Sequence, residues 1–437
     1  MRSSKKASSQ RLAWIEGTRM FAAVMILLYH AQLLMTHYAF TPQPQGLTKN
    51  LSLIGNVSDR LGHHLFTSIL SFPIWFGFQF VDVFILISGF SLVLSLKGKP
   101  LETVPFLRHR FLRILWPFWT VAWLSYPILW GIGKVTSSYI PDSWHMFAGI
   151  TFPLLFDYAA EPLLPTSGPW WFVSLILSFT FIFPFLWDLL HRWGSRNLLG
   201  VSLLLTLAYR TLAVYLFGGH PTYVVLDTPA NWLPFVPFLA KLSTFVLGMV
   251  VAKAYCNGKG PIFWSSRLAL SVGILTYTIG FICQFYWSGW IVTDLLLPIG
   301  LTLGCMVTFK TLSPLNGAES TLRWLGSHSY SYFLIHNFVI DRTIQLVVKD
   351  NLSLYYLLLP AMLIAALVLA VIVDAITPAI RQLVVTLLEF VNRILTKHSV
   401  SQREFWNSTD DHSSGGTSRN HASHPSHPGI SVTKSVR

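Results

Sequence analysis

Residues 73–96 read PIWFGFQFVDVFILISGFSLVLSL, and Asp82 is the one acidic or basic side chain in this stretch. A helix needs about 20 apolar residues to cross roughly 30 Å of hydrocarbon, so the stretch predicts a membrane-spanning helix. With it, the chain contains ten apolar stretches of comparable length. They fall at 13–36, 73–96, 111–133, 170–190, 197–217, 232–252, 266–287, 289–309, 328–348 and 354–378. We therefore predict an all-α fold, a polytopic membrane helix bundle with about ten transmembrane helices.

The composition of the whole chain is that of a membrane protein. Of its 437 residues, 53% are hydrophobic and 11% are charged. Soluble domains carry roughly 25% charged residues, so this chain lacks the polar surface to face water on all sides. We predict an integral, multi-pass protein of the plasma membrane or of an endomembrane. The three cysteines show no metal-ligand spacing, so we expect neither a disulfide framework nor a metal site.

The excess of basic residues predicts the orientation of the chain. Lysine and arginine number 31 against 18 acidic residues, and they lie in short loops between apolar stretches. Basic loops favour the cytosolic side, so we expect both termini in the cytosol and no nucleic-acid partner. The predicted parts are a basic N-terminus at 1–12, a membrane domain at 13–396 and a disordered tail at 397–437.

Arg19 and His30 are ionisable residues within the first predicted span. They are eleven residues apart, which is about three helical turns, so both are expected on one face, about 16 Å apart along the axis. Ionisable groups inside a membrane usually mark a functional site. The alternative is an arginine that extends to the membrane surface and a histidine bound to a backbone carbonyl.

Asp82 is the third ionisable residue of this kind, and it needs a partner because it lies in a strongly apolar run. It is expected either to orient His30 or a substrate hydroxyl, or to form an ion pair that only holds helices together. His336 and Asp374 fall in the last two predicted spans.

The segment 108–113 reads RHRFLR and follows the second span. Anchoring of the chain on the cytosolic side explains this cluster adequately. Arg110 and Arg113 are one turn apart at the predicted start of a helix, where guanidinium groups and free helix N–H groups also suit a phosphate-rich ligand.

Several common catalytic motifs are absent from the sequence. It contains no Walker A loop, no dinucleotide fingerprint and no His-Glu-x-x-His. Ser88 and Ser91 lie near a glycine, but no Gly-x-Ser-x-Gly elbow is present, which argues against a serine hydrolase.

Five segments together resemble the membrane acyltransferases called acyltransferase type 3, in the same order and over residues 12–378. They are WIEGTR at 14–19 followed by Tyr29-His30, FVDVF at 80–84 with SGF at 88–90, RFLRILWP at 110–117, Trp171-Phe172 with Pro184, and GSHSYSYFLIH at 326–336. The chain departs from the family pattern at Glu16, where aspartate is usual, and at Phe80, where glycine is usual. Ile176 and Leu177 stand where many members carry glutamate, so no role of that glutamate can be transferred.

The resemblance implies an enzyme that transfers an acyl group other than an aminoacyl group. The group is usually acetyl and passes from acyl-CoA to a hydroxyl of a carbohydrate, lipid or small-molecule acceptor, as in O-acetylation. Acyl-CoA is then a donor substrate, no further cofactor is expected, and membrane lipids surround the protein. His30 is the expected general base, because an imidazole titrates near neutral pH.

The other expected roles follow from the same resemblance. Arg19 stabilises the thioester carbonyl or holds the donor, Asp82 orients a partner, and Arg110 and Arg113 bind the CoA phosphates. Supporting roles are expected for Glu16, Ser88, Tyr330 and His336. Direct transfer and an acyl-His30 intermediate both remain open.

Two other classes of function are compatible with the same residues. A multispan transporter can use His30, Asp82 and His336 as a relay for protons or substrate. The absence of an internal repeat argues against the common transporter designs. A receptor or scaffold without catalytic activity is the third alternative.

Overall fold

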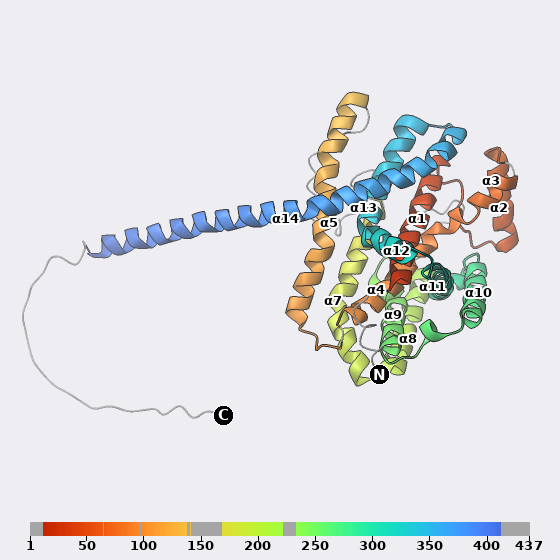
Figure 1. The fold of residues 1–437 in the computed structure, drawn as a ribbon, viewed down its shortest axis with the longest axis horizontal. Helices are drawn as coiled ribbons and strands as arrows, with labels where there is room; N and C mark the ends of the chain where they lie inside the picture. Colours follow the sequence, from red (N-terminus) through yellow and green to blue (C-terminus); the bar gives the residue numbers. More distant parts are fainter. Residues whose placement is uncertain are drawn as a thin grey trace, which may run out of the picture. The chain divides into compact units, whose positions relative to one another are not determined.

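The computed structural model describes residues 12–411 except 64, 97, 138–139, 141–167 and 222–232. Within these residues the regular elements are helices, and one isolated bridge pairs Gln45 with Tyr286 (Figure 1). The predicted all-α fold is confirmed. The α-helices are α1 (Ala13–Met35), α2 (Leu47–Arg60), α3 (Leu65–Ser71), α4 (Phe80–Leu96), α5 (Thr103–Thr136), α7 (Trp171–Arg192), α8 (Gly194–Tyr215), α9 (Leu242–Cys256), α10 (Ser266–Cys283), α11 (Thr293–Leu312), α12 (Ala318–Ser327), α13 (Ser329–Thr343) and α14 (Leu352–Asp411).

Eight helical segments among the described residues are long and apolar enough to cross a membrane. The predicted spans 111–133 and 328–348 fall on α5 and on α13, and neither helix is among the eight. The multi-pass membrane fold is therefore confirmed, whereas the count of ten spans stays a prediction. The eight segments are 13–35, 67–96, 171–192, 194–215, 238–256, 266–283, 293–312 and 352–395.

The chain divides into two compact units, Met1–Pro378 and Ala379–Arg437. The first unit contains the helix bundle and every residue of the candidate site. The described part of the second unit is the end of α14, which continues to Asp411. The tail boundary predicted at 397 thus does not coincide with the end of a helix. Residues 1–11 and 412–437, which contain most of the predicted N-terminus and tail, lie outside the described residues.

Helix α1 is the central element of the first unit. It packs against α4, α11, α12 and α13, and most of its side chains are buried (Figure 1). In contrast, α10 buries only Ala269, Gly273 and Gly280 and exposes its larger apolar side chains. A helix that is apolar on its exposed face is suited to hydrocarbon rather than to water. Most residues of α1 therefore lie in the interior of the bundle.

Two glycines allow α4 and α9 to approach closely. A Cβ atom added to Gly89 would lie 2.1 Å from the Phe245 carbonyl oxygen, and one added to Gly248 would lie 2.0 Å from that of Leu86. Small residues commonly bring membrane helices into such contact, because packing rather than water drives their association. Gly89, part of the Ser-Gly-Phe segment, thus has a packing role.

Gly248→Ala is expected to lower the stability of the bundle by about 1–3 kcal/mol, because an extra methyl group forces α4 and α9 apart. The measurement is the thermal unfolding of the purified protein in detergent. Gly200→Ala on α8 is the matched control, since nothing lies within 4 Å of the added atom. Equal unfolding midpoints for the two variants would contradict this explanation.

Candidate active site

A charged cavity of about 160 Å³ lies between α1, α4, α5, α7, α12 and α13. It brings together most of the predicted site residues, which come from parts of the chain more than three hundred residues apart. Its polar lining consists of Glu16, Arg19, Ser88, Arg110, Arg113, Ser327, Ser329 and Tyr330. Three arginines face one carboxylate in this lining, so the cavity carries an excess of positive charge.

Arg19 is held in the cavity by residues of two helices. Its Nη1 atom donates to Glu16 Oε1 at 3.0 Å, and its Nη2 atom donates to Ser91 Oγ at 2.7 Å. Glu16 is almost completely buried on the same helix, one turn away. Glu16 thus helps to fix the guanidinium group of Arg19, and its supporting role in the reaction stays a prediction.

Arg110 and Arg113 enter the cavity from α5. Arg110 is half-buried, and its Nε atom is buried without a hydrogen-bond partner among the described residues. Arg113 is exposed, so this pair of cations can be reached from outside the bundle. The prediction that both lie at the start of a helix is wrong, because α5 begins at Thr103. The free N–H groups of a helix terminus therefore do not contribute to this site.

Aromatic side chains form the apolar wall of the cavity. Phe333 packs against Phe84 and Phe172, with ring centroids 6.1 Å and 5.2 Å apart. Phe333 also contacts His336, at 5.5 Å between centroids. Ile176 lines the same cavity. The apolar wall therefore connects the arginines with a histidine.

His336 is paired with His30 across α1 and α13. The Nδ1 atom of His30 and the Nε2 atom of His336 are 2.8 Å apart, and the two ring planes differ by 7°. The Nδ1 atom of His336 lies 2.5 Å from the Phe333 carbonyl oxygen. His336 is completely buried, whereas His30 is half-buried. The structure thus places the predicted base beside a predicted supporting residue.

Tyr330 links the site to α5. Its hydroxyl donates to the Ile114 carbonyl oxygen at 3.0 Å, while the Trp170 Nε1 atom donates to the Leu334 carbonyl oxygen at 2.9 Å. These two bonds fix the helix that carries His336. Ser88 lines the charged cavity from α4.

The structure does not bring Asp82 to His30. Asp82 pairs with Lys241 at 2.9 Å, and Lys241 also contacts Asp294, which pairs with Arg210 at 2.8 Å. All four side chains are buried, and they join α4, α8 and α11 to Lys241, the residue just before α9. The alternative interpretation of Asp82, an ion pair that holds helices together, describes this arrangement. Among the described residues, no hydrogen bond or ion pair joins Asp82 to the charged cavity or to the histidine pair.

Three members of this ion-pair network were not predicted from the sequence. Arg210, Lys241 and Asp294 all fall within predicted spans, at 197–217, 232–252 and 289–309. The rule that singled out Asp82, a charge within an apolar stretch, also applies to them. Two acids and two bases within apolar spans predict that each needs a partner, but not which groups pair.

Asp374 forms a separate contact within the first unit. Its carboxylate lies 2.5 Å from His328 Nδ1 and also accepts a hydrogen bond from Ser331 Oγ. These bonds tie the first part of α14 to the start of α13. Asp374 therefore supports the position of the helix that carries His336.

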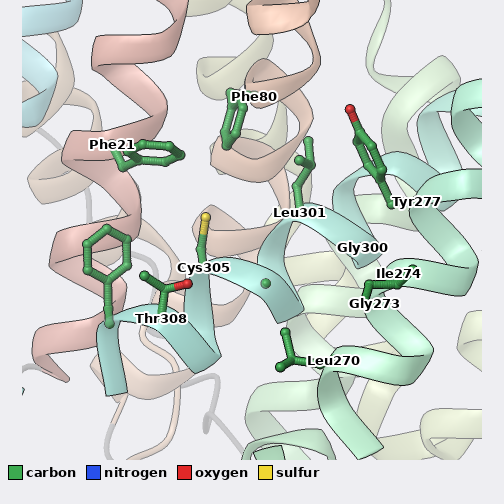
Figure 2. A pocket seen from close by; sticks show the side chains of 12 residues that line it. Phe21, Phe80, Leu270, Gly273, Ile274, Tyr277, Gly300, Leu301, Cys305 and Thr308 are labelled. Carbon is green, nitrogen blue, oxygen red and sulfur yellow. The ribbon is translucent and has the colours of Figure 1, made fainter. Parts of the chain in front are cut away.

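A second cavity, of about 330 Å³, lies between α1, α4, α10 and α11. Figure 2 shows Phe21, Phe80, Leu301 and Cys305 around this space. No acidic or basic side chain lines it among the described residues. It therefore offers nothing to balance the charge of a phosphate group, whereas the arginine-lined cavity does.

A family model described as an acyltransferase domain matches residues 12–375. The match covers α1 to α13 and the first part of α14, and so it includes the charged cavity and the histidine pair. The chain matched none of the curated proteins and none of the solved structures with which it was compared.

Proposed function

The chain belongs to the acyltransferase family whose model covers residues 12–375, and we propose that this membrane acyltransferase moves an acetyl group from acetyl-CoA to an acceptor hydroxyl. The observation that carries the proposal is that Phe333 lines the arginine-lined cavity and also contacts His336, which pairs with His30. The arginines offer positive charge for a phosphate-rich donor, and His30 offers a base for the acceptor hydroxyl. No further cofactor and no metal are needed for this reaction.

The arginine side of the cavity is suited to the phosphates of CoA. Guanidinium groups bind phosphate oxygens through paired, charge-assisted hydrogen bonds. Arg110 supports this assignment because its buried Nε atom has no partner among the described residues. The predicted orientation places this end of α5 on the cytosolic side, where acyl-CoA is available.

Arg19 is better suited to holding the donor than to stabilising the reacting carbonyl. It lies in the same cavity as Arg110 and Arg113. His30 is eleven residues further along α1, which is about 16 Å along the helix axis. A general base and an oxyanion-stabilising group must both lie within hydrogen-bond distance of the reacting groups. The separation along α1 is too large for Arg19 and His30 to act there together. We therefore propose that the extended pantetheine arm of CoA passes the phenylalanine wall between Arg19 and His30.

The reaction at His30 is an ordinary acyl transfer. His30 removes the proton of the acceptor hydroxyl, and the hydroxyl oxygen attacks the thioester carbonyl carbon. The C–O bond forms, the C–S bond breaks, and the proton passes from His30 to the departing sulfur. General base catalysis of this kind contributes typically 10²–10⁴-fold to a rate.

Release of free CoA thiol by the purified protein in detergent tests the proposal, with acetyl-CoA as donor and a membrane extract as the source of acceptor. Detergent solution has no compartments, so transport alone cannot produce this signal. Thiol release that requires both the protein and the extract is the expected result. A folded protein that binds no acetyl-CoA and releases no thiol would overturn the proposal.

The double variant Arg110→Gln, Arg113→Gln is expected to raise the KM for acetyl-CoA by about 10²–10⁴-fold. Charged hydrogen bonds contribute roughly 1.5–3 kcal/mol each, and every 1.4 kcal/mol is tenfold. The KM for the acceptor should stay within a factor of about two of the wild-type value. Initial rates over a range of each substrate provide both constants.

Arg108→Gln is the matched control for this variant, because Arg108 is exposed on the same helix and does not line the cavity. It should leave both constants unchanged. If the double variant depended on acetyl-CoA in the same way as the wild type, the two arginines would have a role in membrane orientation alone.

A further inference from the structure

The His30–His336 pair has a geometry that specifies where its protons lie. His336 Nδ1 is 2.5 Å from the Phe333 carbonyl oxygen, and a carbonyl oxygen can only accept a hydrogen bond. The proton of this contact therefore belongs to His336 Nδ1. In a neutral imidazole with a proton on Nδ1, the Nε2 atom carries a lone pair.

The same reasoning extends to His30. The Nε2 atom of His336 lies 2.8 Å from His30 Nδ1, and since it carries a lone pair it accepts this hydrogen bond. His30 Nδ1 is then the donor, so the free lone pair of His30 is on Nε2. Both nitrogen atoms of His336 are used in the two hydrogen bonds. His336 therefore has no lone pair left to act as the base itself.

We propose that His336 is a positioning residue that holds His30 in the tautomer with its proton on Nδ1, so that Nε2 is the atom that accepts the proton of the acceptor hydroxyl. This inference rests on the proposed function and specifies the base to a single atom. The surroundings of His336 support the assignment. It is completely buried, and the helix that carries it is fixed by the Tyr330–Ile114 and Trp170–Leu334 hydrogen bonds.

The pair also has a role after the proton has moved. When His30 Nε2 takes the hydroxyl proton, His30 becomes an imidazolium whose Nδ1 proton still points to the lone pair of His336. A hydrogen bond to the charged form stabilises that form, so His336 favours the step. The proton then leaves from Nε2 to the thiolate of CoA, and His30 returns to its starting tautomer. No proton needs to pass along the pair for the cycle to close.

Two substitutions of His336 separate this role from simple packing. Leucine fills a similar volume but cannot accept a hydrogen bond from His30. Glutamine can accept from His30 Nδ1 with its carbonyl oxygen and donate to the Phe333 carbonyl oxygen with its amide. His336→Leu is expected to lower kcat by about 10²-fold or more, a loss in the range of general base catalysis. The kcat of His336→Gln should be at least tenfold higher than that of His336→Leu. The KM for acetyl-CoA should be unchanged in both variants.

The tautomer itself is measured by ¹⁵N spectroscopy of protein labelled at its histidine side chains. The His30 signals, assigned by their loss in His30→Gln, should show a protonated Nδ1 in the wild type and a mixed population in His336→Leu. A wild-type His30 with its proton on Nε2 would overturn the inference. Thermal unfolding and acetyl-CoA binding identify variants that are folded.

The activities of the variants separate this inference from the proposed function. Equal kcat values for folded His336→Leu and His336→Gln, at any level, would overturn the positioning role. If these variants were fully active while His30→Gln was inactive, the acyltransferase proposal would stand without the positioning role. An active His30→Gln variant would instead remove His30 as the base, and the inference with it.

Discussion

His30→Gln is expected to lower the rate of acyl transfer by about 10²–10⁴-fold, while the protein still inserts and folds. Glutamine has a similar length, and its amide can still donate to His336 across the 2.8 Å contact. It cannot accept and release a proton near neutral pH, so the contribution of general base catalysis is lost. The measurement is the initial rate of CoA thiol release at saturating acetyl-CoA, per amount of protein that elutes as a single species in detergent.

His191→Gln is the matched control for this experiment. His191 is exposed near the end of α7, where its Nδ1 atom contacts the Trp187 carbonyl oxygen of its own helix. The control should keep the wild-type rate. A His30→Gln variant as active as the control would show that His30 is not the base. The two histidines of the pair are then either structural or used in another step.

Lys241→Met is expected to lower the stability of the bundle by about 3–5 kcal/mol, because it leaves a buried carboxylate without its partner. Lys241 bridges Asp82 and Asp294, and both acids are almost completely buried. Arg210 remains beside Asp294, so Asp82 is the group that loses its counterion. Thermal unfolding in detergent measures the effect, and Lys259→Met, at an exposed lysine, is the control.

The double variant Asp82→Asn, Lys241→Met tests whether Asp82 supports the fold or the chemistry. Removing one acid and one base restores charge balance, since Asp294 keeps Arg210. We expect this variant to recover most of the lost stability and to keep its transfer activity. A double variant as unstable as Lys241→Met would contradict the ion-pair explanation. A stable but inactive double variant would show that Asp82 takes part in the reaction.

The sequence was sufficient to predict the fold class and the relation between residues on one helix. Apolar stretches located the membrane helices, because hydrocarbon requires about 20 apolar residues for each crossing. The helical period predicted Arg19 and His30 on one face of α1, and in the structure Arg19 lines the charged cavity while His30 pairs with His336. Such predictions need only the geometry of a single helix.

Contacts between distant helices could not be predicted in the same way. His30 and His336 are 306 residues apart in the sequence, and Asp82 and Lys241 are 159 apart. Which charge meets which partner depends on how the helices pack, and a hydropathy pattern contains no such information. Asp82 shows this limit, because the sequence left an ion pair and a role beside His30 equally open.

The ends of two helices also differed from the expectation. Hydropathy indicates where a chain is apolar, whereas a helix can continue beyond the apolar stretch. For this reason α5 begins at Thr103, before the predicted span, and α14 continues to Asp411. The earlier start of α5 matters for Arg110, which therefore lies inside a helix. Its guanidinium group, rather than the free N–H groups of a helix terminus, is available to a phosphate.

The most direct test of the account follows the two halves of the donor separately. Purified wild-type protein in detergent is incubated with membrane extract and acetyl-CoA that carries one label on the acetyl group and another on the CoA. The account predicts that the acetyl label appears in the acceptor fraction, in proportion to the free CoA released, while the CoA label does not. Folded wild-type protein that leaves both labels on intact acetyl-CoA would contradict the central claim that this membrane protein is an acetyl-CoA-dependent acyltransferase.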